Sequence, residues 1–309
     1  MKQIRKINGG RLLVLDVKSS SILSFDTNGN DLITITDQLS GTPGGIAVDP
    51  FKGHIYWTSM GEYHEGEHFP KNDGSIHRIN FDGSGHTIVI PKGVTFTPVQ
   101  MQIDVVNDFI YWSDREGMRV MRAKLSGSNI TTLIQTGEGD EDRKVETRHC
   151  VGIAIDPVNR YLYWTQKGPA DGGKGRIFRS GLDILPNADP RNRNDIELLF
   201  DGLPKPIDLE IDRLGEKLYW TDRGDGPNGN TLNRVSIGNK KIGKHEILVS
   251  ALDEAIGLSV DAENDKVYFT DLTGHIYSST LDGLNRRDLF SGNRMFTGIT
   301  YLPSGLNGY

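Results

Sequence analysis

The most suggestive chemical pattern in the sequence is a pair of histidines in a polar stretch. The segment 64–68 reads HEGEH and satisfies the H-E-x-x-H pattern of zinc proteases. That chemistry needs both histidines on one face of a helix. Glycines and a proline interrupt the stretch 61–74, and the pieces between them are too short for a stable helix. We therefore expect a solvated loop without a metal, in which His64 and His68 remain candidates for substrate binding.

Two other segments carry pairs of polar residues two positions apart. Gln100 and Gln102 form one pair, and Asp208 and Glu210 form the other. Residues i and i+2 share one face of a strand, so each pair faces one side. A buried carboxylate is costly unless it is solvated, paired or bound to a cation. One interpretation is a water-filled channel in which an arginine or lysine pairs with a carboxylate. The other is a polar pocket floor, in which all four residues are catalytic candidates.

A lone thiol is the next candidate. Cys150 follows His149, an arrangement that could supply a nucleophile. We prefer to interpret Cys150 as a small buried residue that begins a strand, because free cysteine is among the most buried residue types. His149 is kept as a candidate for substrate binding. The remaining substrate-binding candidates are aromatic or flexible residues: Tyr63, Phe96, Met295 and Phe296.

These residues must be positioned by a repeat. A tetrad of the form Tyr-Trp-Thr-Asp returns at intervals of about 50 residues, which is typical of repeat folds. Each tetrad follows an apolar segment that ends in aspartate, and two more strand-like segments come after it. Four strands per unit predict a β-propeller blade. The tetrads begin at Tyr56, Tyr111, Tyr163, Tyr219 and Tyr268.

A sixth unit is split between the two ends of the chain. Leu13–Asp16 stands where a tetrad belongs, and the missing first strand is found at Gly298–Leu302. Joining them closes a ring and hides the sheet edges. We therefore predict an all-β, six-bladed propeller with four antiparallel strands per blade, as a single domain over residues 1–309. The aspartates that end the first segments should cap turns: Asp49, Asp104, Asp156, Asp212 and Asp261.

Composition narrows the possible partners. The chain has 309 residues, a formal net charge of −6 and no long basic run, which argues against nucleic acid and anionic membranes. No apolar run is long enough to cross a bilayer. The N-terminal residues are better interpreted as a first strand than as a signal peptide. A single cysteine permits no internal disulfide. We expect a cytoplasmic protein.

The connections suggest which face of the ring carries function. In a propeller, the loops after the second strand and those leading into the next blade share one face. The long segments fall in these two sets, and long loops are often functional. We expect a ligand on this face, over the central channel. The segments are 60–73, 91–97, 136–149, 167–174 and 222–230.

The tetrads and the segments before them resemble the YWTD propellers, the class B repeats of the low-density lipoprotein receptor family. The resemblance covers essentially residues 10–302. Receptors of that family flank their propellers with cysteine-rich modules and enter the secretory pathway, whereas this chain has one cysteine. The resemblance therefore implies the fold and not the receptor function.

The chain also looks like the fungal hetero-Diels–Alderases of tropolone–sesquiterpene biosynthesis, in its compact size and isolated YWTD blades. That resemblance implies an enzyme that joins a tropolone-derived o-quinone methide to a macrocyclic terpene such as humulene. Such chemistry needs proximity in an apolar pocket and hydrogen bonds to the heterodiene carbonyl, without metal, cofactor or nucleophile. It assigns the four polar candidates to the heterodiene, and Phe96, Met295 and Phe296 to the hydrocarbon.

Two alternatives belong to other functional classes. A metal-dependent hydrolase similar to the six-bladed gluconolactonases would hold a divalent cation at the channel mouth. Asp208 and Glu210 could be ligands, but the asparagine ligands expected from other inner strands are missing. A non-catalytic, protein-binding propeller is the other alternative, which the negative charge and polar loops permit.

Overall fold

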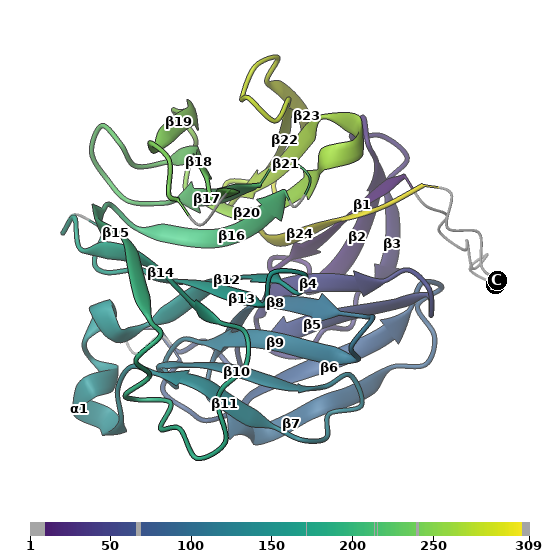
Figure 1. Cartoon of the computed structure of the whole chain (residues 1–309). Helices are drawn as coiled ribbons and strands as arrows, with labels where there is room; N and C mark the ends of the chain where they lie inside the picture. Colours follow the sequence, from purple (N-terminus) through teal and green to yellow (C-terminus); the bar gives the residue numbers. More distant parts are fainter. Residues whose placement is uncertain are drawn as a thin grey trace.

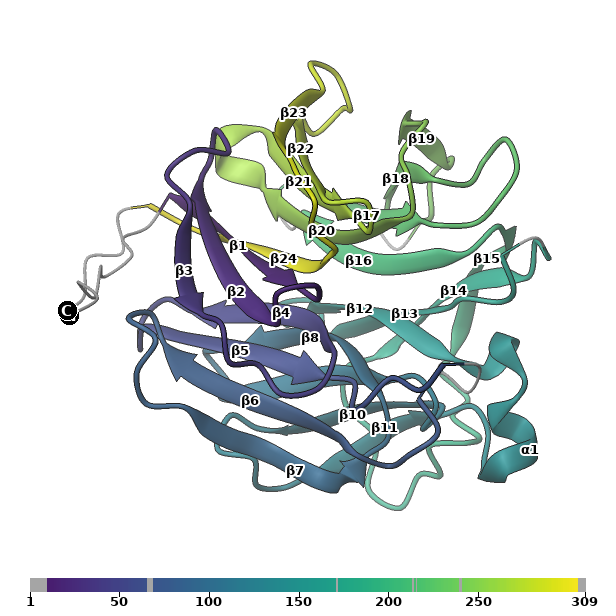
Figure 2. The ribbon, with the colours of Figure 1, turned by 180° about the vertical axis from the view of Figure 1, so that it is seen from behind.

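The computed structural model describes residues 10–65, 69–170, 172–212, 214, 216–238 and 241–304. These residues form six four-stranded sheets arranged around a common centre (Figures 1 and 2). Adjacent strands within each sheet are antiparallel. The predicted fold class is therefore confirmed. No helix in the described part of the chain is long and apolar enough to span a membrane.

Each sheet is one blade, whose four strands follow one another from the channel outward. Blade 1 comprises β24 (Phe296–Leu302), β1 (Arg11–Asp16), β2 (Ser21–Asp26) and β3 (Ile33–Thr36). Blade 2 comprises β4 (Pro43–Asp49), β5 (His54–Ser59), β6 (Gly74–Asn80) and β7 (Thr87–Thr95). Blade 3 comprises β8 (Pro98–Asp104), β9 (Phe109–Asp114), β10 (Arg119–Lys124) and β11 (Thr131–Gln135). Blade 4 comprises β12 (Cys150–Asp156), β13 (Tyr161–Gln166), β14 (Gly175–Gly181) and β15 (Glu197–Leu203). Blade 5 comprises β16 (Pro206–Asp212), β17 (Lys217–Asp222), β18 (Thr231–Ser236) and β19 (Glu246–Val249). Blade 6 comprises β20 (Ala255–Asp261), β21 (Lys266–Asp271), β22 (His275–Ser279) and β23 (Arg287–Ser291).

The ring closes through the C-terminal strand. β24 pairs antiparallel with β1, with Leu12 opposite Tyr301 and Val14 opposite Ile299. Figure 1 shows the yellow end of the chain lying beside its purple beginning. Every inner strand also contacts the inner strands of both neighbouring blades. The predicted split of the first blade is confirmed.

The tetrads build the core between blades. Successive side chains of a strand point to opposite faces, so the tyrosine and tryptophan of one tetrad face different neighbours. Tyr56 of blade 2 accordingly shares a buried cluster with Trp112 of blade 3. Tyr163 of blade 4 shares another with Trp220 of blade 5. Each tetrad thus seals two interfaces, which explains why it recurs in the sequence.

The hydroxyl at the third tetrad position ties each inner strand to the next one. Thr165 is an example: its Oγ1 accepts a hydrogen bond from the Gly152 amide at 2.7 Å and donates to the Ile207 carbonyl at 3.1 Å. The pairing of β12 with β13 is irregular between Cys150 and Ile153, so the Gly152 amide bonds to a side-chain oxygen instead of a strand carbonyl. Equivalent bridges come from Thr58, Ser113, Thr221 and Thr270. Blade 1 lacks this hydroxyl, and Thr297 instead donates to the Pro43 carbonyl at 3.1 Å.

The aspartates that end the inner strands cap turns, which confirms the prediction. Asp156 accepts bonds from the amides of Val158 and Asn159 at 3.1 and 2.9 Å. The other four accept backbone amides of the following turn in the same way: Asp49, Asp104, Asp212 and Asp261.

The connections differ in one respect from what the sequence predicts. A loop is expected over 91–97, but β7 continues to Thr95, so most of this segment is strand. The segment 136–149 holds two short helices, α1 (Gly139–Arg143) and η1 (Glu146–Arg148). A third, η3 (Ala262–Asn264), begins the turn after β20.

The hydroxyl bridges can be tested in blade 4. Thr165→Val keeps the shape of the side chain but leaves the Gly152 amide and the Ile207 carbonyl without their partner. We expect a loss of about 2–4 kcal/mol in the free energy of unfolding, measured by urea denaturation. Thr165→Ser keeps the hydroxyl and should cost less than half as much. Equal losses in the two variants would contradict this role of the hydroxyl.

Candidate functional site

The four polar residues predicted at the channel converge in part. The Nε2 of Gln102 donates to Oε1 of Glu210 at 3.1 Å, so blades 3 and 5 meet across the channel. Gln100 is 4 % exposed, and its Nε2 has no hydrogen-bond partner among the described atoms. Polar groups from both pairs therefore lie inside the ring, as the strand pattern predicts.

Asp208 is held by backbone amides rather than by a cation. Its Oδ1 accepts from the Leu209 amide at 2.9 Å, and its Oδ2 accepts from the Leu258 amide at 3.0 Å. Burial raises the pKa of Asp208 well above its ordinary value, and the nearby Glu210 adds to the effect. Among the described contacts of Asp208, the expected arginine or lysine partner does not occur. The carboxyl group links the inner strands of blades 5 and 6.

The predicted aromatic and flexible candidates do not form one pocket. Tyr63 is exposed and packs edge-on against Phe69 at 5.6 Å between ring centroids. The Phe96 ring lies under the Arg143 guanidinium, 4.0 Å from its centroid. Met295 is 40 % exposed.

Phe296 lies in the core. It is fully buried among the cluster between blades 6 and 1, with its ring 5.9 Å from that of Phe290. Its side chain packs in the core at the start of an inner strand and presents no exposed surface in this structure.

The histidine candidates lie in different surroundings. His64 and Glu65 lie in an irregular segment, and 66–68, including His68, lie outside the described residues. His149 is 6 % exposed, and its Nε2 donates to the Arg143 carbonyl at 2.8 Å. Burial lowers the pKa of His149. In the described part of the chain, no three histidine, cysteine or carboxylate side chains gather as metal ligands.

The preferred interpretation of Cys150 is confirmed. It begins β12, it is fully buried, and burial raises the pKa of its thiol to about 12. A thiol at that pKa has almost no thiolate near neutral pH and is a poor nucleophile.

Sequence reasoning missed a cluster of cations on the predicted face. The Nζ of Lys167 lies 2.6 Å from Oε2 of Glu146, and the Nζ of Lys205 lies 4.0 Å from the same oxygen. Arg115 lies close enough to influence the pKa of both lysines. We call Arg115, Lys167 and Lys205 the cationic cluster. The lysine side chains are only 13 % and 15 % exposed.

The electrostatics of the cationic cluster follow from its burial. Burial lowers the pKa of Lys167 to about 8, and repulsion from Arg115 and Lys205 adds to this, against the hydrogen bond to Glu146. Burial also lowers the pKa of Lys205. Cations held in so little water make strong hydrogen bonds to an oxygen atom.

An apolar ring adjoins the cationic cluster. It is a buried cluster of residues from the upper ends of the inner strands and the loop after β5, and Leu272 packs against it. We call it the apolar ring: Met60, Phe69, Val99, Val151, Ile207 and Ile256. Ile207 follows Lys205 by two positions, so the apolar ring and the cationic cluster are neighbours along this connection.

One position in each repeat distinguishes a cationic half of this face from an apolar half. The residue directly after the tetrad is a cation in blades 3, 4 and 5: Arg115, Lys167 and Arg223. In blades 1, 2 and 6 it is apolar: Val17, Met60 and Leu272. Comparing the six repeats at this position would have revealed the cations. Lys205 and Glu146 lie in connections and carry no such signal.

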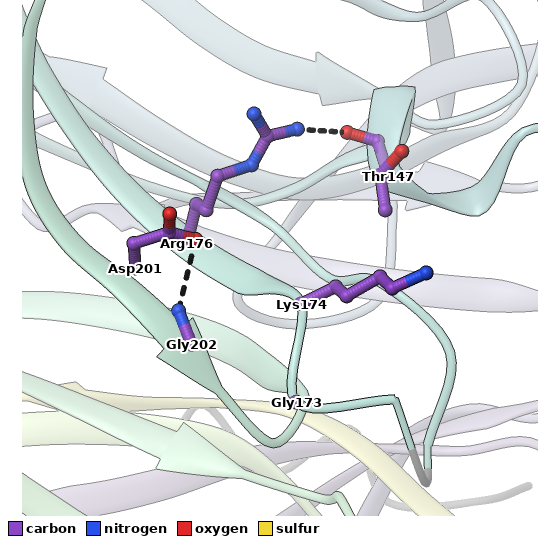
Figure 3. Close-up of a pocket in the computed structure, with 6 residues that line it drawn as sticks. All are labelled: Thr147, Gly173, Lys174, Arg176, Asp201 and Gly202. Carbon is purple, nitrogen blue, oxygen red and sulfur yellow. Dashed lines mark hydrogen bonds between the residues drawn. The ribbon is translucent and has the colours of Figure 1, made fainter.

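A cleft of about 530 Å³ opens on the outer side of blade 4, next to η1. Figure 3 shows the Arg176 side chain reaching toward η1, where it donates to the Thr147 carbonyl at 2.7 Å. We call it the blade 4 cleft, lined by Thr147, Gly173, Lys174, Arg176, Asp201 and Gly202. It lies close to the cationic cluster, because Thr147 is adjacent in η1 to Glu146, which pairs with both lysines. Thr147, Gly173 and Lys174 fall in the long segments 136–149 and 167–174, but none of the individually named candidates lines the cleft.

The chain is similar in sequence to proteins that are already known. No family model matches the chain. A Pyricularia oryzae protein named "Low-density lipoprotein receptor-related protein 1" is 44 % identical over 241 residues, covering 74 % of this chain and 75 % of that protein. The "3-hydroxyacyl-CoA dehydrogenase-like protein LAM1" of Cochliobolus heterostrophus is 36 % identical over 311 residues. The match covers 94 % of this chain but only 64 % of that relative, less than two thirds of its length.

Solved structures share the fold. A chain of the nidogen/laminin complex gives a TM-score of 0.73 at 21 % identity, covering 96 % of this chain and 99 % of that one. TolB from Acinetobacter baumannii gives 0.67 at 16 %, covering 96 % and 67 %. Regucalcin from Agrobacterium tumefaciens, a calcium-binding protein, gives 0.61 at 14 %, covering 87 % and 80 %. At these identities the likeness concerns the fold alone.

The carboxylate of Asp222, the last residue of the blade 5 tetrad, should make the stability of the protein depend on pH. Asp222 accepts the amides of Lys205 and Gly224 at 2.9 and 2.8 Å, and burial raises its pKa from 3.8 to about 6. The folded state therefore holds this proton more tightly, so stability falls as pH rises from 4 through 6. Asp222→Asn keeps the accepting oxygen and loses this titration. Relative to wild type, its unfolding free energy should improve by at most about 3 kcal/mol between pH 4 and 7.5. A difference independent of pH would contradict the assignment.

The buried thiol predicts slow chemistry. Dithionitrobenzoate at pH 8 should leave Cys150 unmodified in the folded protein, because the thiolate is scarce and shielded. In 8 M urea the same reagent should titrate one thiol per chain. Rapid modification of the folded protein would show that Cys150 is accessible and ionised.

Proposed function

The chain belongs to the family of the Pyricularia oryzae low-density lipoprotein receptor-related protein 1, a family of YWTD-type six-bladed propellers, and we propose a function for the face that carries the cationic cluster and the apolar ring. The protein is a biosynthetic enzyme that catalyses an intermolecular hetero-Diels–Alder cycloaddition. It joins a tropolone-derived o-quinone methide to a macrocyclic terpene such as humulene. The names of the relatives specify no such reaction.

The proposal rests on the residue that directly follows each tetrad, which is cationic in blades 3, 4 and 5 and apolar in blades 1, 2 and 6. A cycloaddition between a polar heterodiene and a hydrocarbon needs one surface of hydrogen-bond donors beside one apolar surface. Arg115 and Lys167 belong to the first half, and Met60 and Leu272 belong to the second. A single face with both characters suits two unlike partners better than it suits one uniform ligand.

The donors would act on the heterodiene. Cycloaddition converts three π bonds into one carbon–carbon σ bond, one carbon–oxygen σ bond and one new π bond, and it releases no group. Negative charge grows on the quinone methide oxygen as the bonds form. Lys167 and Arg115 can stabilise it by hydrogen bonding, and their burial strengthens that interaction. Holding both partners in register supplies the remaining acceleration.

The channel residues act indirectly, through the inner strands. Gln102 and Glu210 join blades 3 and 5, and Asp208 joins blades 5 and 6, under the cationic half. We assign them a positioning role, since their hydrogen bonds fix the inner strands that carry Val99, Ile207 and Ile256. Exposed Met295 supplies flexible apolar surface in blade 1.

The alternatives have less support. A metal-dependent hydrolase needs several ligands at the mouth, and the described residues offer no group of three. A protein-binding propeller remains the second class. The fold is shared with a chain of the nidogen/laminin complex, but that likeness does not carry the partner to this chain.

The decisive experiment mixes the purified protein, a quinone-methide precursor and humulene. We expect a stereochemically pure adduct formed faster than the spontaneous background. Lys167→Met should slow the catalysed reaction by roughly tenfold to hundredfold, because it removes one donor to the developing oxyanion. Lys92→Met, an exposed lysine on the outer strand of blade 2, is the matched control and should leave the rate unchanged. Racemic adduct at the background rate would reject the proposal.

A further inference from the structure

Two lysines share one carboxylate oxygen in the cationic cluster. Glu146 Oε2 lies 2.6 Å from Lys167 Nζ and 4.0 Å from Lys205 Nζ. The other two cations nearby each have a carboxylate of their own. Arg115 binds Glu116 with its Nε at 2.7 and 2.8 Å from the two oxygens, and Arg223 lies 2.5 Å from Glu254. Each arginine therefore has a carboxylate within hydrogen-bond distance, whereas the two lysines share Glu146.

Lys205 has the longest ion pair of these cations. Within the described residues, the 4.0 Å approach to Glu146 is its one ion pair, and this distance is too long for a hydrogen bond. An ammonium group has three N–H donors. Lys205 can therefore accept a further anionic partner without losing an existing hydrogen bond of its ammonium group.

Glu146 is more exposed than the two lysines that it pairs with. Its side chain is 41 % exposed, against 13 % for Lys167 and 15 % for Lys205. It reaches the lysines from η1, a three-residue helix in the connection between β11 and β12. A carboxylate in this position lies over the two lysines and can turn toward solvent when another anion replaces it.

The surroundings select an organic anion over an inorganic one. Val151 and Ile207 of the apolar ring are the second residues of the inner strands β12 and β16 and are buried, at 2 % and 4 % exposed. The carbon skeleton of a ligand that places oxygen atoms on the lysines would lie next to these apolar side chains. Burying that skeleton adds affinity that phosphate or sulfate cannot gain.

We propose that Lys167 and Lys205, supported by Arg115, bind a small organic anion with two adjacent oxygens, of the tropolonate or arylcarboxylate class. Glu146 occupies this position when the ligand is absent. The inference deepens the proposed function. It rests on that function for the identity of the ligand, because the precursor of the heterodiene would bind at this site in its anionic form. The binding itself needs no reaction.

The test is isothermal titration with tropolone and benzoate, in the absence of any terpene. Both should bind at one site and compete. Lys205→Met should weaken tropolone binding at least about tenfold, because it removes a charge-assisted hydrogen bond. Glu146→Gln should strengthen it by about threefold to tenfold, because it removes the competing carboxylate. A purely structural role for the ion pair would not raise affinity.

Control variants make the outcome decisive. Lys92→Met should bind tropolone like the wild type, and Lys205→Arg should restore much of the affinity lost in Lys205→Met. Thermal melting of each variant checks folding. Inorganic phosphate binding as tightly as tropolone would overturn the organic class. Loss of binding in Lys174→Met with none in Lys205→Met would move the site to the blade 4 cleft and overturn the assignment.

Failure of the inference can be separated from failure of the proposed function. Selective cycloaddition without tropolone binding in the titration would reject the anion site and keep the enzyme. Tropolone binding that depends on Lys205, with no cycloaddition above background, would keep the anion site and reject the reaction.

Discussion

The hydroxyl bridge between neighbouring inner strands is the interaction on which the structure depends. Each bridge satisfies an irregular strand amide and a carbonyl of the next blade, as Thr58 does for Gly45 and Val99 at 2.8 and 2.7 Å. Five tetrads supply such a group, and Thr297 supplies the last contact around the ring. These buried groups would otherwise lack partners at a cost of about 1–3 kcal/mol each. The bridges therefore fix how closely six strands approach the axis.

Fixing the inner strands also fixes the upper face. The residue after each tetrad lies two positions beyond the bridging hydroxyl, so its place is set by the same hydrogen bonds. Evolution can change that residue without changing the ring. In this chain it is cationic in three consecutive blades and apolar in the other three. The chemical character of the mouth is thus determined at a position that the fold leaves free.

Much of the fold could be predicted from the sequence because its determinants are local and repeated. The alternating Tyr and Trp, the turn-capping aspartates and the split first blade each have a direct signal. The burial of Cys150 also follows, because free cysteine is among the most buried residue types. The burial of Phe296 could not be predicted, because the alternation of side chains does not show which of the first residues of a strand enters the core. The pairing of Lys167 and Lys205 with Glu146 joins three separate connections, so only the folded chain brings it together.

The central claim is that the cationic cluster and the apolar ring form one ligand site. A crystal structure of the protein soaked with tropolone tests it most directly. We expect both tropolone oxygens within hydrogen-bond distance of Lys167 and Lys205, with the seven-membered ring against Val151 or Ile207. Tropolone bound on the opposite face of the propeller, or within the blade 4 cleft and away from both lysines, would contradict this claim.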